Sequence, residues 1–351
     1  MNNPYRYIIV LFLVICSGCS SITYYSQSIA GQTEIWMRQK PIDDLLAEPD
    51  LDPQLKNRLE LVKAIRQFSI TELGLPDNES YLKYADLQRR FVVWTIYATP
   101  RYSLTPQTWC YLVVGCLRYK GFFNEKTAMN EVVKLRKQGL DVYMGGVTAY
   151  STLGWFSDPV LNTMFNWSDI ELTKVIFHEL AHQLLYIKND TVFNESFAET
   201  VAIIGIRKWL EQQNNEELRI KFEKHRAIQQ LFNKLVFKYK GKLQKLYQSD
   251  LTETVMEKEK SEIFMALQNE YDQEKINWQS ITYDSWFENN LNNAKLASVL
   301  TYYEYVGDML AIYEKSARQI DRFFVIMKQL SRCEQNNRIR LIKEQIINVS
   351  C

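Results

Sequence analysis

The residues best suited to chemistry form the stretch His178-Glu179-Leu180-Ala181-His182, an HExxH pattern. Histidines four positions apart lie on one face of a helix, one turn from each other, so both imidazoles can bind a single zinc ion. The side chain of Glu179 is rotated toward the water that such an ion binds and can act as its general base. We therefore predict a catalytic Zn²⁺ site on this helix.

A catalytic zinc ion usually takes three protein ligands, so this site needs a third donor. The following segment, FNESFAE over residues 193–199, offers Glu195 and Glu199 on one helical face. One carboxylate can bind the metal while the other hydrogen-bonds a ligand imidazole from behind. A symmetric hairpin turning near residue 190 would bring Glu199 level with His182. From the spacing alone, both carboxylates remain candidates.

The reaction also calls for a donor near the zinc that stabilises a tetrahedral oxyanion, and a tyrosine or histidine can serve. Tyr150, Tyr302, Tyr303 and Tyr305 are candidates, but the chain has 21 tyrosines and the sequence does not select one. His225 is the remaining histidine. It stands between a lysine and an arginine, which predicts a solvated surface residue.

Two helices are expected to position the metal ligands. The first begins at Ser168, because Ser168-Asp169-Ile170-Glu171 has the form of a capping box and apolar residues follow it. The second is expected to begin at Asn194 and to run toward Trp209, after a turn at residues 189–190.

The rest of the chain is predicted to be mixed, with strands before the metal helices and helices after them. Runs of β-branched and aromatic residues predict strands over residues 91–97, 109–114 and 141–150. Apolar periodicity predicts helices over residues 55–68, 126–138, 255–274 and 294–331. Gly145 and Gly146 would let an extended peptide approach the third strand closely, as at the edge strand of a zincin.

We therefore predict an α+β, zincin-like fold with a small sheet, a metal-binding helix and a mostly α-helical C-terminal half. The predicted segments are a signal peptide (1–18), a lipid-anchored tether (19–33), a catalytic domain (34–210) and a helical region (211–351).

The N-terminus is predicted to export the chain. Arg6 is followed by an apolar run over residues 7–16, too short for a comfortable membrane span, and then by small residues directly before Cys19. This pattern resembles the lipobox of bacterial lipoproteins, in which the cysteine carries the lipid. With Ser20 following, the lipoprotein sorting rule indicates the periplasmic face of the outer membrane, so we expect Cys19 to attach the protein there.

The composition argues against nucleic-acid binding, and the sequence does not decide whether the cysteines form disulfides. Lys plus Arg number 42 against 41 for Asp plus Glu, far from the basic excess of a nucleic-acid-binding protein. An oxidising periplasm would permit disulfides among Cys110, Cys116, Cys333 and Cys351. Cys110 and Cys116 are too far apart along a straight strand to be bonded unless the chain bends at Gly115, so free buried thiols are an equal alternative.

Several segments together resemble one known family. HELAHQ, FNESFAE, AYSTLGWFSDP, LGLPDNESYLKYADL and WCYLVVGC look like the bacterial lipoprotein family of predicted aminopeptidases, which are zincins of the glutamate type. The resemblance implies a zinc-dependent peptidase with His178, His182 and Glu195 as ligands and Glu179 as general base. Its NExFA pattern favours Glu195 over Glu199, which becomes the supporting or alternative ligand.

The sequence thus predicts a lipid-anchored zinc peptidase of the cell envelope, an aminopeptidase by resemblance, that hydrolyses peptide substrates with a Glu-activated water. The alternative from another class is a zincin-fold lipoprotein that acts as a binding or assembly factor with structural or vestigial zinc. An intact Glu179 favours the enzyme.

Overall fold

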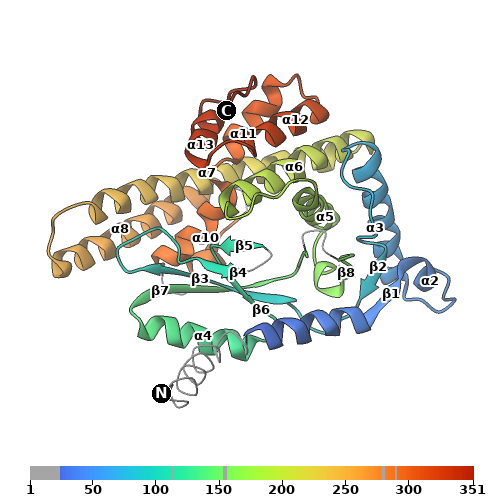
Figure 1. Ribbon diagram of the computed structural model, residues 1–351, viewed down its shortest axis with the longest axis horizontal. Helices are drawn as coiled ribbons and strands as arrows, with labels where there is room; N and C mark the ends of the chain where they lie inside the picture. Colours follow the sequence, from blue (N-terminus) through green and yellow to red (C-terminus); the bar gives the residue numbers. More distant parts are fainter. Residues whose placement is uncertain (1–23, 112–113, 153–155, 279–280, 289–290) are drawn as a thin grey trace, which may run out of the picture.

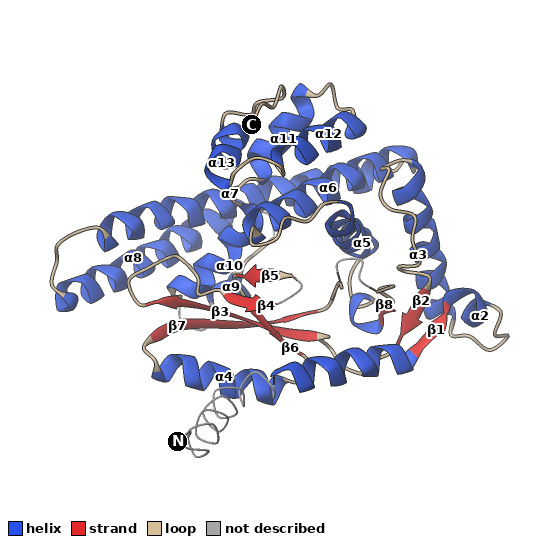
Figure 2. Cartoon of the chain, viewed as in Figure 1, coloured by secondary structure: helices blue, strands red, loops and turns tan. Residues whose placement is uncertain are grey.

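The computed structural model describes residues 24–111, 114–152, 156–278, 281–288 and 291–351. The signal peptide and Cys19 therefore lie outside the described residues. The fold is mixed α and β and mostly helical, with small sheets, as Figures 1 and 2 show. This confirms the predicted α+β class. The closer likeness to zincins and the domain boundaries stay predictions.

The described strands form a central three-stranded sheet, a second small sheet and a hairpin. The central sheet has the order β6-β3-β7, all antiparallel; the second has the order β1-β2-β8, and the hairpin pairs β4 with β5. The strands are β1 (Gln39–Pro41), β2 (Lys83–Ala85), β3 (Val93–Pro100), β4 (Trp109–Tyr111), β5 (Gly115–Leu117), β6 (Lys120–Phe122), β7 (Leu140–Val147) and β8 (Val160–Leu161).

Helices surround these sheets. A helix covers residues 24–38. The others are α2 (Ile42–Leu46), α3 (Pro53–Thr71), α4 (Glu125–Lys137), α5 (Asp169–Leu184), α6 (Thr191–Gln212), α7 (Glu216–Tyr247), α8 (Glu253–Glu274), α9 (Asp284–Phe287), α10 (Asn293–Tyr303), α11 (Val306–Lys315), α12 (Ile320–Leu330) and α13 (Gln335–Lys343), with 3₁₀ turns η1 (Asn162–Met164) and η2 (Lys275–Asn277). Among the described helices, none combines the length and apolar character that crossing a bilayer requires.

The central sheet separates two layers of helices. Both α4 and α10 contact β3 and β7, and they lie on opposite sides of the sheet (Figure 1). Because side chains alternate along a strand, Ile96 and Ala98 of β3 pack with Val132 of α4. Tyr97, between them, points to the other side, where its phenol is hydrogen-bonded to Tyr302 of α10. The sheet therefore presents one face to α4 and the other to α10, which in turn packs against α6.

The predicted start of α5 is confirmed. Ser168 accepts a hydrogen bond from the backbone of Glu171, and Glu171 accepts one from the backbone of Ser168, which completes the capping box. Helix α5 packs along α6 through a core cluster that includes Ile176, Phe177 and Phe197, all fully buried. This packing fixes the relative positions of the two motifs that carry the ligands.

The turn between α5 and α6 is shorter than the sequence suggested. Asn189 adopts a left-handed backbone (φ 69°), and Asp190 caps α6 by accepting a hydrogen bond from the backbone of Phe193. Asn194, the expected start of the helix, instead closes the turn with two 2.8 Å hydrogen bonds to the backbone of Ile187. The capping side chain thus starts α6 three residues earlier, at Thr191.

Other predictions need correction. The expected tether is helical from residue 24, because Ile35 and part of Tyr24 bury their side chains against the body. The predicted helix over residues 294–331 is divided into α10, α11 and α12. Gly146 does not leave room for a ligand, since a Cβ there would lie 2.4 Å from the ring of Phe91. The glycine accommodates this ring, although β7 does lie at the edge of its sheet.

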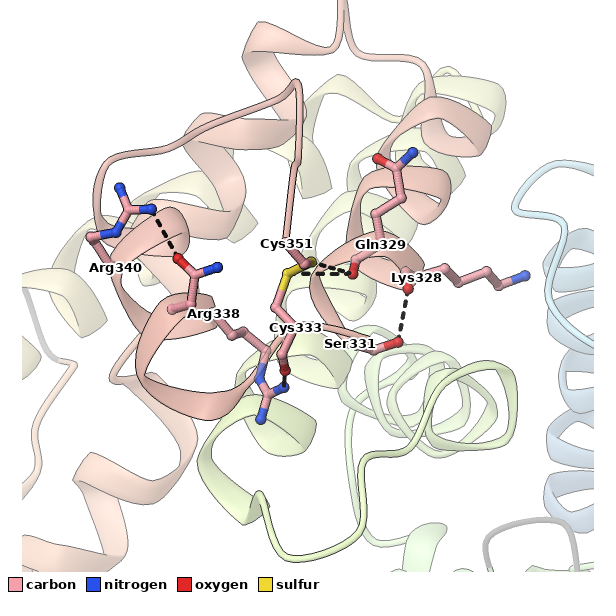
Figure 3. The surroundings of a disulfide bond; sticks show 8 residues. Lys328, Gln329, Ser331, Cys333, Arg338, Arg340 and Cys351 are labelled. Carbon is pink, nitrogen blue, oxygen red and sulfur yellow. Dashed lines mark hydrogen bonds between the residues drawn. A yellow bond between two sulfur atoms is a disulfide. The ribbon is translucent and has the colours of Figure 1, made fainter.

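The cysteines form two disulfides. Cys110 and Cys116 are bonded across the β4-β5 hairpin, where Gly115 adopts a positive φ of 80°, so the bend that the sequence required is present. The backbone N–H of Cys116 donates to Asn189, which docks the hairpin on the α5–α6 turn. Cys333 is bonded to Cys351 (Figure 3). The alternative of free thiols is wrong for these four residues.

The C-terminal helices are also tied to α6. Arg338 of α13 is buried, donates to the backbone oxygen of Cys333, and lies 2.6 Å from the carboxylate of Asp190 (Figure 3 shows the first contact). Asp190 is the residue that caps α6. The C-terminal region therefore supports the start of the helix that carries Glu195.

Candidate metal centre

Three predicted ligands converge between α5 and α6. The Nε2 atoms of His178 and His182 lie 3.3 Å and 3.6 Å from Oε2 of Glu195. His182 and Glu195 are buried, and His178 is partly buried. One ligand atom from each residue lies within 4.8 Å of the others. The structure brings together the residues that the sequence analysis selected.

This arrangement fits a tetrahedral divalent metal ion. Ligands at about 2.0–2.2 Å from a tetrahedral centre are separated by roughly 3.4 Å from each other. Both histidine-to-Glu195 distances are close to this value. Two neutral imidazoles and one carboxylate form a donor set that zinc enzymes use, with a fourth position open to water or substrate. His178, His182 and Glu195 therefore form a group that could hold a metal ion.

The second carboxylate, Glu199, supports the site from behind. Its Oε2 lies 3.8 Å from Nδ1 of His178, on the side of the ring away from Glu195, and its Oε1 forms a 2.6 Å ion pair with Lys174. Lys174 lies one turn before His178 on α5. A carboxylate in this place orients an imidazole ligand and makes it a better donor.

Electrostatics favour charged carboxylates in the centre. Burial opposes ionisation of Glu195, but electrostatic attraction to His182 and a hydrogen bond with His178 lower the pKa of Glu195 to about 2. Burial likewise opposes ionisation of Glu199, yet Lys174 and His178 lower its pKa to about 2. Burial would lower the pKa of His178, but hydrogen bonds with both glutamates raise it to about 10. The pocket thus attracts positive charge, as a cation site must.

Glu179 differs from the other two glutamates. Burial raises the pKa of Glu179, and the nearby charges of His178 and His182 only partly oppose this effect. A carboxyl group whose pKa moves toward neutrality is better suited to accept and return a proton. The side chain sits beside the ligand histidines in a partly buried position.

Three tyrosines complete the site, and of these Tyr97 and Tyr119 were not among the sequence candidates. The hydroxyl of Tyr119 donates to Oε1 of Glu195 at 3.4 Å. Tyr97, from β3, is hydrogen-bonded to Tyr302, whose ring centroid is 6.3 Å from that of His178. Burial, reinforced by the charge of Glu195, raises the pKa of Tyr119 and of Tyr302 well above the usual value. Both phenols therefore stay protonated and can donate hydrogen bonds.

Tyr81 also lies near the metal-ligand candidates, and its backbone conformation is unusual. It is fully buried and has a φ of 63°, a left-handed conformation that bulky residues rarely adopt. Its N–H donates to the backbone oxygen of Asp158 at 2.7 Å. Burial raises the pKa of Tyr81 well above the usual value, with further contributions from Glu179 and Asp158, so its phenol lies near the general-base candidate.

The remaining sequence candidates make other contacts. Tyr303 is near Glu199 and Lys174, and its hydroxyl accepts a hydrogen bond from Gln229 of α7. Tyr150 packs edge-on against Phe123. His225 is exposed on α7, as predicted. Tyr305 precedes α11, and its backbone N–H donates to Ser196 of α6 at 3.2 Å. Among the described residues, Tyr302 is thus the candidate tyrosine whose ring lies beside a ligand histidine.

A cavity of about 460 Å³ is lined by residues of α7, α10 and the loop after β3, and its lining includes none of the three metal-ligand candidates and not Glu179. Val192, on its wall, is one helical turn before Glu195, and Arg118 precedes Tyr119 in the chain. Lys240 and Glu304, which form an ion pair at 2.7 Å, also line it.

The comparisons with known proteins identify the family. The family model described as "putative aminopeptidase" matches residues 23–342, and the chain belongs to this family. The matched range includes all three candidate ligands, Glu179 and the tyrosines around them. No curated protein and no solved structure was found to match the chain.

Proposed function

We propose that this protein is a zinc-dependent peptidase, and more narrowly an aminopeptidase. The observation that carries the proposal is the convergence of His178, His182 and Glu195 beside Glu179 in a chain of the putative aminopeptidase family. Zinc is proposed because two imidazoles and one carboxylate are a ligand set typical of zinc hydrolases. A bound Zn²⁺ would supply a Lewis acid that activates water and polarises a peptide carbonyl.

The chain's own residues have separate roles in this proposal. Glu179 accepts a proton from the attacking water and returns it to the leaving amine, which its raised pKa favours. Tyr302, a neutral phenol beside His178, donates a hydrogen bond to the oxygen that becomes negatively charged. Tyr119 holds the carboxylate of Glu195 by its 3.4 Å hydrogen bond. Glu199 and Lys174 orient His178.

The proposed location is the cell envelope, with a lipid on Cys19 that attaches the protein to the periplasmic face of the outer membrane. Two disulfides among the described residues support an oxidising compartment. Mass spectrometry of the mature N-terminus tests this part. A diacylated or triacylated Cys19 supports it, and an unmodified or uncleaved N-terminus contradicts it.

The activity can be tested with the purified protein and a mixed peptide library read by mass spectrometry. Removal of single residues from peptide N-termini, lost in Glu179→Gln but retained in the matched surface variant Glu60→Gln, would support a metallo-aminopeptidase. Glu60 is exposed on α3, away from the site. Internal cuts with the same dependence would replace the aminopeptidase by an endopeptidase. Bound zinc without any Glu179-dependent cleavage would favour the binding-factor alternative.

A further inference from the structure

The helix over residues 24–38 carries an exposed apolar face, on which Trp36 packs edge-on against Phe156 at 4.9 Å. Tyr25, Ile29, Trp36 and Met37 are 43%, 66%, 42% and 76% exposed. Their spacing places them along one side of the helix. The helix has two charged residues, Glu34 and Arg38, which form an ion pair with each other at 3.2 Å, and Glu34 also pairs with Arg89. A solvated helix of a globular protein normally carries charge on its outer side.

The opposite side of this helix is fixed to the body, so the apolar face must point outward. Ile35 is fully buried, and a Cβ on Gly31 would overlap the ring of Phe123. The side chain of Gln27 accepts a hydrogen bond from the backbone of Phe123 at 3.0 Å. The helix is therefore seated rigidly, and rotation cannot hide its exposed residues.

The same kind of surface continues on α4. Met129 and Val133 are each 46% exposed, and Lys126, Lys134 and Lys137 are exposed beside them. Tyr24 packs against the cluster to which α4 contributes its core residues, and Figure 1 shows both helices on one side of the central sheet. Apolar side chains mixed with lysines suit the boundary between anionic lipid headgroups and acyl chains.

The position of the helix over residues 24–38 in the chain also indicates a membrane as its partner. Residue 24 comes five positions after Cys19, the proposed lipid attachment, and an extended chain of five residues spans at most about 18 Å. A lipid on Cys19 would therefore hold this helix close to the membrane surface. The two or three acyl chains expected on Cys19 anchor the protein, and contact of this helix with the membrane would orient the body on it.

We propose that Tyr25, Ile29, Trp36, Met37, Met129 and Val133 form a bilayer-contacting face that lies in the headgroup region of the membrane. The metal helices α5 and α6 lie on the other side of the central sheet (Figure 1), so the metal centre faces away from the bilayer toward soluble substrates. This inference rests on the proposed lipid attachment and is independent of the peptidase activity.

The test uses the full chain, purified from membranes with its native N-terminus. The protein is reconstituted into vesicles of phosphatidylethanolamine and phosphatidylglycerol whose acyl chains are brominated, and tryptophan fluorescence is compared with that in unbrominated vesicles. The difference between wild type and Trp36→Phe isolates the emission of Trp36. We expect brominated lipid to remove most of this emission, and to remove much less of it in Ile29→Glu/Met37→Glu.

A matched pair of variants controls for added charge. Met265 and Ile276 are 58% and 80% exposed on α8 and η2, outside the proposed face. Met265→Glu/Ile276→Glu should leave the quenching of Trp36 unchanged. Equal quenching in wild type and Trp36→Phe would overturn the proposal, and so would a concentration-dependent dimer that Ile29→Glu/Met37→Glu dissociates. Mass analysis of Cys19 on the same sample separates failure of the lipid attachment from failure of the face.

Discussion

The Nζ of Lys174 lies 2.6 Å from Oε1 of Glu199, and the other oxygen of this carboxylate faces Nδ1 of His178 at 3.8 Å. Glu199 therefore links Lys174 to His178, a metal-ligand candidate that lies one turn further along α5. A charged partner that fixes one carboxylate oxygen leaves the other free to orient the imidazole.

The first prediction concerns this pair. Glu199→Gln should weaken metal binding by roughly 10–100-fold without abolishing it, because the ligands remain but His178 loses its orienting partner. Competition with a chromophoric chelator measures the affinity. The control is Glu223→Gln, which breaks the 2.6 Å ion pair with Arg207 between α6 and α7. Equal loss of affinity in both variants would point to general destabilisation.

The second prediction separates the two acidic candidates. Glu195→Ala should remove bound metal, since it deletes a ligand, whereas Glu199→Ala should retain a substantial fraction. Metal content after gel filtration, by inductively coupled plasma mass spectrometry, decides between them. The same metal content in both alanine variants would show that the assignment of Glu195 is wrong.

The third prediction concerns Tyr302. Tyr302→Phe should lower kcat by about 10²-fold or more while changing KM little, because the phenol is proposed to donate in the transition state. Metal content should not change. Tyr239→Phe, which removes a hydroxyl bonded to Glu270 far from the ligands, is the matched control. A rise in KM at constant kcat would instead give Tyr302 a role in substrate binding.

The fourth prediction concerns the C-terminal helix α13. Arg338→Gln should lower the free energy of unfolding by about 3–5 kcal/mol, because it leaves the buried Asp190 carboxylate without its ion-pair partner. Asp190 caps the helix that carries Glu195, so metal affinity should fall as well. Arg340→Gln, whose ion pair with Glu344 is exposed, should change stability little. Thermal and chemical denaturation give the comparison, and equal effects of both substitutions would contradict this account.

The metal helices could be predicted because their signals are local. The capping box at Ser168 and the four-residue spacings of the histidines and glutamates each lie within one or two helical turns. Because Asp190 caps α6, the helix begins at Thr191, three residues before the predicted start at Asn194. Such details depend on which of several nearby polar side chains caps the helix.

Other parts of the site could not be predicted because they depend on distant packing. Tyr81, Tyr97 and Tyr119 precede His178 by many residues, and only the folded sheet and loops bring them near the ligands. Strands of two or three residues, such as β8, carry too little periodic pattern to be recognised. The segment over residues 19–33 was predicted to be a tether because it is mostly polar, with Ser, Tyr, Gly and Gln, and this composition did not reveal the helix that begins at residue 24.

The most direct test of the central claim is the metal content of the purified protein and of two histidine variants. The account predicts about one equivalent of zinc in the wild type and in His225→Ala, since His225 is exposed on α7, and almost none in His182→Ala. A wild-type protein purified without metal that also fails to bind added zinc would contradict it. So would equal zinc in His182→Ala and His225→Ala.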